Sequence, residues 1–367
     1  MIILHVLEPF ATGTTTAVNA ITRGVPDFTH IVIHGSRNWT RNTEKVKNSF
    51  PPGVSFIEWK NAGREISPVN DWKALRSLIK ILKPYAKQKK ESRNPFVVHL
   101  HSSKAGFLGR LACRILGIKT VVYTPHCGSF LRTDIGFFKR KLYYFLEWLG
   151  GCFGGRVVGC GPSEGEIYKK LGKNITYVSN GVTIREAVDQ KTKRDLISFT
   201  GLASLQKDPS LWSAIAFGST TTAAEYGFSF CWIGDGPEAE KLKQDFIILT
   251  GWKNEDEVAE LHKNTAVFFS ASAWEGLPYG VLEAMSSGCA LLLRNIPGHR
   301  DLVIPGENGW LFDTREEAIN RLDEMIKDRT LLSEMGKRSI EIVKQRFSLK
   351  QMGEGYREIY CQTGAIR

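Results

Sequence analysis

Short apolar segments recur from one end of the chain to the other, and this recurrence constrains the fold more than any other feature of the sequence. Most of these segments run for about 4–7 residues without interruption, as parallel strands do when both faces of their sheet are covered. Thirteen strands are expected, at Ile2–Leu7, His30–His34, Val54–Trp59, Phe96–His101, Thr120–Thr124, Arg156–Cys160, Ile175–Ser179, Leu196–Gly201, Phe228–Ile233, Phe246–Leu249, Ala266–Phe269, Cys289–Leu293 and Trp310–Phe312. Helical patterns lie between them, at Lys104–Leu116, Pro237–Gln244, Asp256–Lys263, Tyr279–Ser286, Arg315–Lys327 and Leu349–Tyr360.

This alternation predicts an α/β fold of doubly wound parallel sheets, and 367 residues are enough for two of them. The domain boundary is expected after Val182, where the polar stretch Thr183–Arg194 precedes the second set of strands. We therefore predict one Rossmann-like domain over residues 1–182 and another over residues 183–346. A C-terminal helix within residues 347–367 could pack on either. Ligands bind open α/β sheets at the carboxyl ends of their strands, so the crevice between the domains is the expected active site.

Charge is distributed unevenly along the chain. Residues 1–180 hold 27 Lys and Arg against 11 Asp and Glu, a net +16, whereas the remaining residues hold 22 against 27, a net −5, which together give the +11 of the whole chain. A basic half favours an anionic partner such as a phospholipid surface, a lipid diphosphate or a nucleic acid. No recognition motif for nucleic acid accompanies it. A solvated basic face without a specific partner is the alternative.

The seven cysteines show neither a C-x-x-C pair nor metal-ligand spacing, which indicates reduced thiols rather than disulfides. The first strand begins at Ile2, without a basic segment or cleavage site ahead of it, so no signal peptide is expected. No apolar run approaches the roughly 20 residues that span a bilayer. These features predict a cytoplasmic protein.

The segment from Ser270 to Met285 carries the strongest chemical signal. A strand ending at Phe269 leads into a loop, and Pro278 then stands where a helix begins, a position that proline favours. The amides of Gly276, Leu277 and the first helical turn would form a diphosphate site, because a helix N-terminus offers unpaired N–H groups and a positive dipole. Glu275 and Glu283 flank this turn, and carboxylates suit hydroxyl pairs of a sugar or ribose. Two unrelated glutamates on an amphipathic segment are the alternative.

Glu275 and Glu283, separated by seven residues and followed in the first case by Gly-Leu-Pro, resemble the E-x7-E motif of the family 4 glycosyltransferases, which have the GT-B fold of two Rossmann-like domains facing across a cleft. The resemblance implies that Glu275 contacts the transferred sugar and that Glu283 binds the ribose. It implies that the segment directly after Glu275, formed by Gly276, Leu277 and Pro278, holds the diphosphate through its backbone amides. The first domain would bind the acceptor and the second the nucleotide sugar.

Further segments match the family in the same order. Phe199–Pro209 resembles a basic loop in which Lys207 would approach the diphosphate, but Leu202 stands where the family has arginine. Leucine cannot supply the bidentate charge of arginine, so either Lys207 and helix dipoles suffice, another cation such as Lys104 substitutes, or activity is weak or absent. The segments around Gly234, Gly236 and Trp252 resemble those that approach the donor and its base.

The first half matches as well. Gly13, after the first strand, fits a glycine-containing turn whose amides would face the donor phosphates. His126, at the carboxyl end of a strand beside Pro125, matches the family's cleft histidine near the transferred sugar. His101 ends another expected strand and Lys104 follows it, and for both we expect either acceptor or phosphate contact or structural capping.

Residues 137–149 mix cations with aromatic side chains, a composition typical of a segment lying on an anionic bilayer. A core helix with a solvated basic turn is the alternative. The cations expected on the membrane surface are Lys139, Arg140 and Lys141, with support from Lys80, Lys83, Lys87, Lys89 and Lys90.

The resemblance implies a retaining glycosyltransferase that moves a hexose or N-acetylhexosamine from a nucleotide sugar, with UDP favoured, to an acceptor. The acceptor is expected to be membrane-associated or a glycan, in bacterial-type polysaccharide or lipopolysaccharide synthesis. No D-x-D motif is present, so no metal is expected. A sugar-nucleotide 2-epimerase or hydrolase of the same architecture is one alternative. A non-catalytic nucleotide-sugar-binding subunit, motivated by Leu202, is another. A plain NAD-dependent enzyme is disfavoured because no G-x-G-x-x-G follows the first strand.

Overall fold

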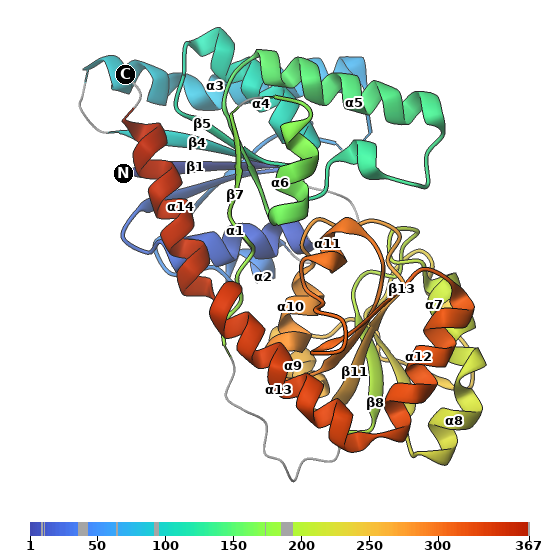
Figure 1. Ribbon diagram of the computed structural model, residues 1–367. Helices are drawn as coiled ribbons and strands as arrows, with labels where there is room; N and C mark the ends of the chain where they lie inside the picture. The colour runs from blue at the N-terminus through green and yellow to red at the C-terminus, as the bar shows by residue number, and fades with distance from the viewer. Residues whose placement is uncertain are drawn as a thin grey trace. The chain divides into compact units, whose positions relative to one another are not determined.

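The computed structural model describes residues 1–8, 10, 12–35, 43–63, 65–91, 95–172, 174–184 and 194–365 (Figure 1). The chain forms two compact units. The first comprises Met1–Leu131, Ile135–Gly181 and Leu349–Arg367, and the second comprises Arg132–Asp134 and Val182–Ser348. The predicted domain boundary follows Val182, whereas the division between the two units follows Gly181, one residue earlier.

The first unit contains a seven-stranded sheet with the order β3-β2-β1-β4-β5-β6-β7, and every neighbouring pair is parallel. The order reverses direction at β1 and β4, which is the point where doubly wound sheets bind ligands. Its strands are β1 (Ile2–Leu7), β2 (Thr29–His34), β3 (Ser55–Glu58), β4 (Phe96–His101), β5 (Val121–Thr124), β6 (Arg156–Gly159) and β7 (Ile175–Tyr177).

Helices cover both faces of this sheet. Apolar side chains such as Leu4, Val98 and Leu100 pack beneath α3 and α4, whereas Ile3 and Val97, one position along each strand, pack on the opposite face. This alternation follows from the two-residue period of a strand. The helical segments of this unit are α1 (Thr12–Gly24), α2 (Thr43–Lys47), α3 (Pro68–Glu91), α4 (Ser103–Leu116), η1 (Ser129–Leu131), α5 (Phe137–Cys152), α6 (Pro162–Lys169) and α14 (Leu349–Gly364).

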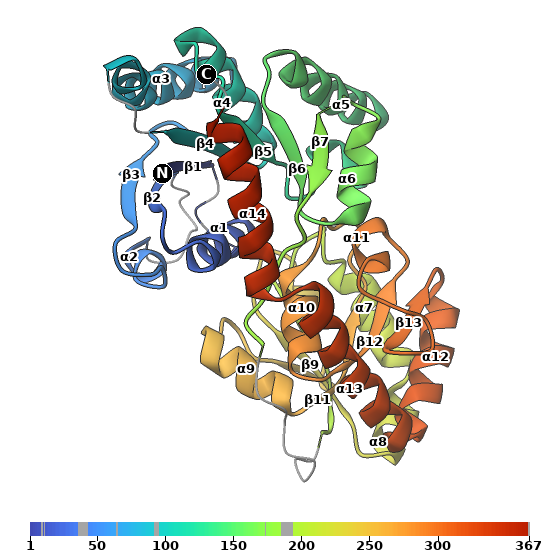
Figure 2. The ribbon, with the colours of Figure 1, turned by 60° about the vertical axis from the view of Figure 1, so that its left-hand side comes forward.

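The C-terminal helix α14 belongs to the first unit, where it lies against α1 and over β4 and β5 (Figure 2). Met352, Tyr356 and Tyr360 recur at helical spacing on its buried face. The two helices cross at glycines, since a Cβ on Gly353 would lie 2.1 Å from the carbonyl oxygen of Gly24. Of the two packing alternatives considered for this helix, the structure shows the one on the N-terminal unit.

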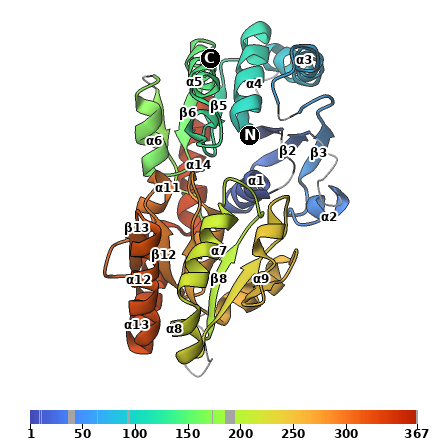
Figure 3. The same ribbon diagram turned by 90° about the vertical axis from the view of Figure 1, so that its right-hand side faces the viewer.

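The second unit contains a six-stranded parallel sheet with the order β10-β9-β8-β11-β12-β13. Helices α10 and α13 lie on one side of the sheet and α7 and α12 on the other, so the strands lie between two helical layers (Figure 1), and Figure 3 views this unit from the side of α7 and α8. The strands are β8 (Leu196–Thr200), β9 (Ser229–Ile233), β10 (Ile247–Leu249), β11 (Thr265–Ser270), β12 (Ala290–Arg294) and β13 (Gly309–Phe312). The helical segments are α7 (Pro209–Gly218), α8 (Thr220–Glu225), η2 (Ala239–Leu242), α9 (Glu255–Lys263), α10 (Tyr279–Ser286), α11 (Pro297–Arg300), α12 (Arg315–Lys327) and α13 (Arg329–Arg346).

The predicted fold class, two doubly wound Rossmann-like sheets, is confirmed, and all thirteen expected strands are present within two residues of their predicted ends. One expected helix is wrong. Pro237–Gln244 contains only the 3₁₀ turn Ala239–Leu242, in which Lys241 donates its amide to the Glu238 carbonyl oxygen three residues earlier. The chain has to enter β10 at Ile247, which leaves room for a single tight turn.

Candidate active site

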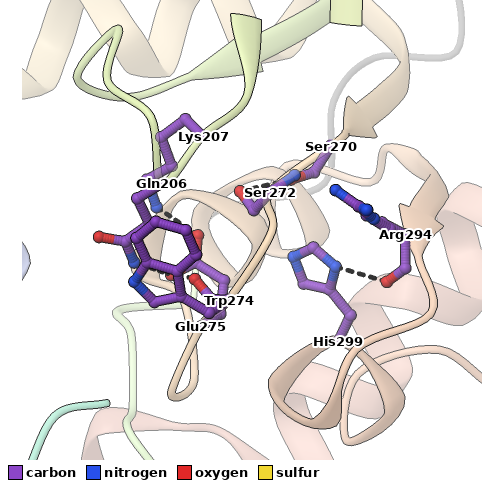
Figure 4. Close-up of polar contacts among 8 residues, drawn as sticks. All are labelled: Gln206, Lys207, Ser270, Ser272, Trp274, Glu275, Arg294 and His299. Carbon is purple, nitrogen blue, oxygen red and sulfur yellow. Dashed lines mark hydrogen bonds and ion pairs between the residues drawn. The ribbon is translucent and has the colours of Figure 1, made fainter. Parts of the chain in front are cut away.

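The loop after β11 carries Glu275, and residues of the loop after β8 hold its carboxylate in place (Figure 4). Lys207 forms an ion pair with Glu275 Oε1. Gln206 Nε2 donates to Glu275 Oε2 at 3.2 Å and to the Trp274 carbonyl oxygen at 3.0 Å. The Glu275 side chain is only 7% exposed, and a carboxylate at that depth needs such partners. The structure therefore brings the predicted residues Lys207 and Glu275 into direct contact at the carboxyl edge of the sheet.

The backbone after Glu275 leads directly into α10. Gly276 and Leu277 are buried, and Pro278 occupies the position before the first helical residue with φ −73° and ψ 125°. Proline has no side-chain acceptor, so it cannot cap the first amides of α10 as Ser, Thr or Asp would. This end of the helix thus keeps the polarity that suits an anion. Glu283 lies one turn into α10 and is partly buried.

Helix α11 packs against the same segment, with Gly298 next to the backbone of Gly276. A Cβ on Gly298 would lie 1.9 Å from the Gly276 carbonyl oxygen, so only glycine allows this approach. The next residue, His299, is fully buried, and its Nδ1 donates to the Arg294 carbonyl oxygen at 2.8 Å. Burial lowers the pKa of His299 to about 4, although the nearby charge of Glu275 acts in the opposite direction.

His299 and Arg294 also lie at this edge of the sheet, and only Arg294 was not expected there. His299 Nε2 is buried and has no hydrogen-bond partner in the part of the chain that the structure describes. Arg294, at the end of β12, lies 3.3 Å from Asp208 Oδ2 and is a second cation near Lys207. Leu202, in the place of the family's arginine, is partly buried. The sequence signal for Arg294 is its position at the carboxyl end of β12.

Gly234 and Gly236 have a structural reason that differs from the expected one. A Cβ on Gly234 would lie 2.2 Å from the Gly201 carbonyl oxygen, and one on Gly236 would lie 2.3 Å from that of Ala203. Their φ angles of 144° and 158° also favour glycine. These glycines therefore let two loops of the chain pack backbone against backbone, whatever else approaches them. Trp252 lies just past the bridge between Gly234 and Gly251 and is half-exposed.

In the first unit, His126 lies in a strained loop after β5. Both His126 and Cys127 have positive φ, 52° and 73°, a region that side-chain-bearing residues rarely adopt. Buried Glu164 stabilises this conformation, because its Oε1 accepts from the Cys127 amide at 2.6 Å and its Oε2 from the Cys160 amide at 2.8 Å. Burial raises the pKa of Glu164.

His126 is the end of a row of hydrogen-bonded histidines that sequence reasoning missed. His126 Nε2 and His101 Nδ1 are 3.0 Å apart, His101 Nε2 and His5 Nδ1 are 3.1 Å apart, and His5 Nε2 and His30 Nδ1 are 3.0 Å apart. His101 is 0% exposed, with both ring nitrogens occupied. Of the two expectations for His101, this geometry favours the structural one, because both ring nitrogens already have hydrogen-bond partners.

The available signal was the His99-Leu100-His101 alternation, which places two imidazoles on one strand face. His5, opposite His99 in the parallel register, lies on that face too. Ring nitrogens of His5, His99 and His101 all lie within 4.8 Å of one another, so these residues could in principle hold a metal ion. Each already has partners, with His99 bonded to Tyr360 and Thr124. A metal would have to replace the His5–His101 hydrogen bond, and the residues fit a hydrogen-bonded row better.

Lys104 and Gly13 complete the predicted contacts of this unit. Lys104 is 11% exposed and bonds Asp71 Oδ1 at 2.5 Å and the Glu65 carbonyl oxygen at 2.7 Å. Of the two expectations for Lys104, these contacts favour the structural one, and its use as a substitute for the missing arginine stays a prediction. Gly13 lies in the first turn of α1, and a side chain there would meet no atom within 4 Å.

Helix α5 presents most of its length to solvent. Lys139, Arg140 and Lys141 are exposed, and Phe138 is 86% exposed. Glu147 holds the helix on the unit by accepting from Tyr123 at 2.9 Å and pairing with Arg110 at 3.4 Å. The solvated basic turn agrees with both expectations for this segment, and the exposed aromatic side chains favour the membrane surface. Lys80, Lys83 and Lys87 are exposed on α3, whereas the side chains of Lys89 and Lys90 lie outside the described residues. Among the described helices, none has the length and apolar character needed to cross a membrane. The exposed apolar side chains of α5 are Phe137, Phe138, Leu142, Tyr144, Phe145 and Trp148.

Known proteins resemble this chain over both units. Residues 184–342 match the family model described as glycosyl transferases group 1, and residues 28–186 match that of glycosyltransferase family 4. A UDP-Gal:α-D-GlcNAc-diphosphoundecaprenol α-1,3-galactosyltransferase of Escherichia coli is 29% identical over 329 residues, covering 81% of each chain. The capsular polysaccharide biosynthesis glycosyltransferase CapM of Staphylococcus aureus is 23% identical, covering 81% of this chain and 82% of CapM.

Solved structures agree on the fold. HepE of Anabaena, in complex with UDP and glucose, superposes with a TM-score of 0.76 at 15% identity and covers 99% of this chain and all of HepE. A sucrose-phosphate synthase of Thermosynechococcus elongatus gives a TM-score of 0.78 at 14% identity, with both chains fully covered. These likenesses and the two family matches lead to one conclusion. The chain is a glycosyltransferase of the GT-B fold and belongs to glycosyltransferase family 4.

Proposed function

We propose that this chain transfers a hexose or N-acetylhexosamine from a nucleotide sugar, with UDP favoured, to a lipid-linked or glycan acceptor, and that the anomeric configuration is retained. The observation that carries the proposal is the buried Glu275 carboxylate, fixed by Lys207 and Gln206 immediately before α10. The E. coli relative is named for UDP-Gal and for a diphosphoundecaprenol acceptor, and HepE binds UDP and glucose, which supports this choice of donor and acceptor. The process served would be bacterial polysaccharide or lipopolysaccharide synthesis.

The proposed role of the second unit is to stabilise the leaving diphosphate. Negative charge grows on it as the glycosidic bond breaks, and donors already in place lower the barrier to that step. Lys207 and the amides at the start of α10 are such donors, while Arg294 is the cation that could take the place of the arginine absent at Leu202. Lys207 is 19% exposed, so it can meet a ligand without leaving Glu275 unpartnered.

In the retaining reaction that we propose, the acceptor hydroxyl attacks from the face that the diphosphate leaves. A phosphate oxygen takes the proton of that hydroxyl, and Glu275 and His126 orient the sugar. Neither residue needs to form a covalent bond with it. Glu283 would bind the ribose, and Gly13, Gly276 and Trp252 would approach the donor.

The decisive experiment supplies the purified protein with a panel of UDP-, GDP- and ADP-sugars, with and without a lipid diphosphate acceptor. We expect a glycosylated lipid from one UDP-sugar and an α linkage when the donor is α, read by NMR of the product. Equal activity in EDTA is expected, because protein groups would neutralise the diphosphate. Free nucleotide released at the same rate without any acceptor would favour the epimerase or hydrolase. Donor binding without turnover, with activity appearing in Leu202→Arg, would favour a non-catalytic subunit.

The same proposal places the acceptor at an anionic membrane, with α5 lying on its surface. Aromatic side chains partition to the headgroup level, and cations beside them are attracted by anionic lipids. Lys139, Arg140 and Lys141 lie next to the exposed Phe138 on this helix. A membrane-borne acceptor would then be delivered to the N-terminal unit. We propose a peripheral location on the cytoplasmic face of the cell membrane.

A further inference from the structure

The row of imidazoles behind His126 ends at a backbone carbonyl. His30 Nε2 lies 2.8 Å from the Val25 carbonyl oxygen, and His30 Nδ1 faces His5. The row continues through His101 to His126, with each ring stacked or tilted on the next at about 5.3 Å between centroids. His30, His5 and His101 lie on β2, β1 and β4 of the first unit, on the face that α1 and α14 cover, and His126 lies in the loop after β5. Three rings, those of His30, His5 and His101, thus connect a fixed carbonyl to His126, the candidate sugar-binding residue.

The carbonyl determines which nitrogen of every ring carries the proton. A carbonyl oxygen only accepts, so His30 must hold its proton on Nε2 and, when neutral, accept on Nδ1. His5 must then donate from Nε2 and accept on Nδ1. His101 likewise donates from Nε2 to His5 Nδ1 and accepts on its own Nδ1. His126 must therefore donate from Nε2 to His101 Nδ1. The last ring is left with an unprotonated Nδ1.

This order requires neutral rings, and burial provides the condition. Burial is the main cause that lowers the pKa of His5 and His101 well below the ordinary value and that of His126 to about 3. A doubly protonated His5 would donate from both nitrogens and reverse the order in His101 and His126. Near neutral pH the rings therefore stay in a single order.

The loop conformation fixes where the lone pair of His126 can point. The positive φ of His126 and Cys127 is held by the two amide hydrogen bonds to Glu164. His126 is partly exposed as a residue, and within the described ranges only His101 forms a hydrogen bond with its ring. Its Nδ1 is therefore the nitrogen left for a ligand.

We propose that the Val25 carbonyl, acting through His30, His5 and His101, locks His126 as the Nε2–H tautomer, so that Nδ1 is a permanent hydrogen-bond acceptor for a hydroxyl of the transferred sugar. The assignment of a sugar as ligand rests on the proposed function, whereas the tautomer does not. His30, His5 and His101 are positioning residues in this scheme. An acceptor-only nitrogen selects a neutral sugar that offers a hydroxyl, and it disfavours a uronic acid carboxylate at the same place.

The tautomer can be read without substrate. In protein labelled with ¹⁵N-histidine, two- and three-bond ¹H–¹⁵N correlations identify the protonated nitrogen of each ring. We expect protonated Nε2 and unprotonated Nδ1 for His126, His101, His5 and His30 at pH 7.5. A proton on Nδ1 of His126, or a stoichiometric metal bound at His5 and His101 in the purified protein, would overturn the proposal.

Two variants of the remote anchor test the transmission. His30→Gln can donate to the Val25 carbonyl and accept from His5 through its amide, so it should preserve the tautomer and the turnover. His30→Phe keeps the ring shape but removes both functions, so His126 should become a tautomeric mixture. We expect its kcat to fall about tenfold, the worth of one neutral hydrogen bond, with the KM for the nucleotide sugar unchanged. An unaltered His126 spectrum in folded His30→Phe would contradict transmission, and if that variant does not fold, the wild-type spectrum and His30→Gln still decide.

A series of donor sugars lacking one hydroxyl at a time tests the ligand. Removing one particular hydroxyl should slow the wild type about tenfold and leave His126→Ala unaffected, because that variant lacks the acceptor. Equal losses in both proteins at every position would overturn the sugar contact. If the predicted tautomers are found but no donor is turned over, the row of histidines stands and it is the proposed function that fails.

Discussion

The Lys207–Glu275 pair shows how much of this site depends on single side chains. Both members were predicted from the sequence, since each follows a strand at its carboxyl end and a strand's end is where open sheets bind ligands. Their direct contact was not predictable, because it depends on how two loops fold over one another. Removing one partner of such a pair leaves a poorly solvated charge, so isosteric neutral variants are the cleaner probes.

At the same scale, Glu283→Ala should chiefly weaken the nucleotide. Its carboxylate is proposed to accept from both ribose hydroxyls, and losing bonds of this charged kind costs about 1.5–3 kcal/mol, or roughly a ten- to hundredfold rise in KM with kcat little changed. Steady-state kinetics over a range of donor concentrations measures this. Glu324→Ala, an exposed residue of α12, is the matched control. An unchanged KM in Glu283→Ala would remove the ribose role.

The sequence alone did not predict which cation replaces the missing arginine, nor that four histidines form a hydrogen-bonded row. The sequence showed that Leu202 stands in the place of the family's arginine. The cation considered as its substitute, Lys104, forms an ion pair with Asp71. The position of Arg294 beside Asp208 is known only from the structure. His101 was singled out for its place at the end of a strand, yet both of its ring nitrogens bond to other histidines. A sequence gives a residue's position along a strand more readily than the partners on its face.

At the scale of elements, apolar runs separated by helical patterns were enough to place every strand, because a parallel strand buried on both faces is apolar throughout. Two helices matched residue for residue, Tyr279–Ser286 and Arg315–Lys327. The segment Pro237–Gln244 failed because a connection of that length can be one tight turn as easily as a helix. The sequence did not determine on which of the two units α14 packs. The helical spacing of Met352, Tyr356 and Tyr360 indicated only that one face of this helix is buried.

Helix α5 carries a prediction of its own. The protein should bind vesicles containing anionic lipid, and the triple change Lys139→Gln, Arg140→Gln and Lys141→Gln should weaken binding by roughly a hundredfold, since each surface cation contributes about 1 kcal/mol. Flotation or sedimentation with vesicles measures the partition.

The control for α5 carries the same charge change elsewhere. Lys327→Gln, Lys337→Gln and Lys344→Gln alter exposed residues of α12 and α13 in the second unit. Binding that falls equally in both triple variants would reflect net charge alone and would contradict a membrane face on α5.

At the scale of the whole molecule, the two units differ in charge and in their content of buried histidine. The sequence predicted the basic N-terminal half from composition alone, but it could not show that His5, His99, His101 and His126 of that half meet in the folded unit. Because these buried histidines lie in the first unit, the free energy of unfolding of the first unit should depend on pH more strongly than that of the second.

Acid should therefore destabilise the first unit. Burial lowers the folded-state pKa of His5, His99 and His101 well below 6.5, so below pH 6.5 the unfolded chain binds protons that the folded unit does not. Stability is full above that pH and declines as the pH falls, by up to about 1.4 kcal/mol per pH unit for each histidine. Urea unfolding between pH 7.5 and 5, followed by hydrogen exchange, should show β1, β4 and α14 opening before the second sheet. Equal stability at pH 7.5 and 5 would contradict this.

The most direct test of the account is the turnover of Glu275→Gln, a variant of nearly the same shape that lacks the negative charge proposed to act on the transferred sugar. With UDP-sugar and lipid diphosphate acceptor, we predict that kcat falls by about 10²–10³, as when a preorganised transition-state contact is lost. UDP affinity, measured by calorimetry, should change by less than about threefold, because the diphosphate and ribose contacts remain. Turnover equal to that of the wild type would contradict the central claim.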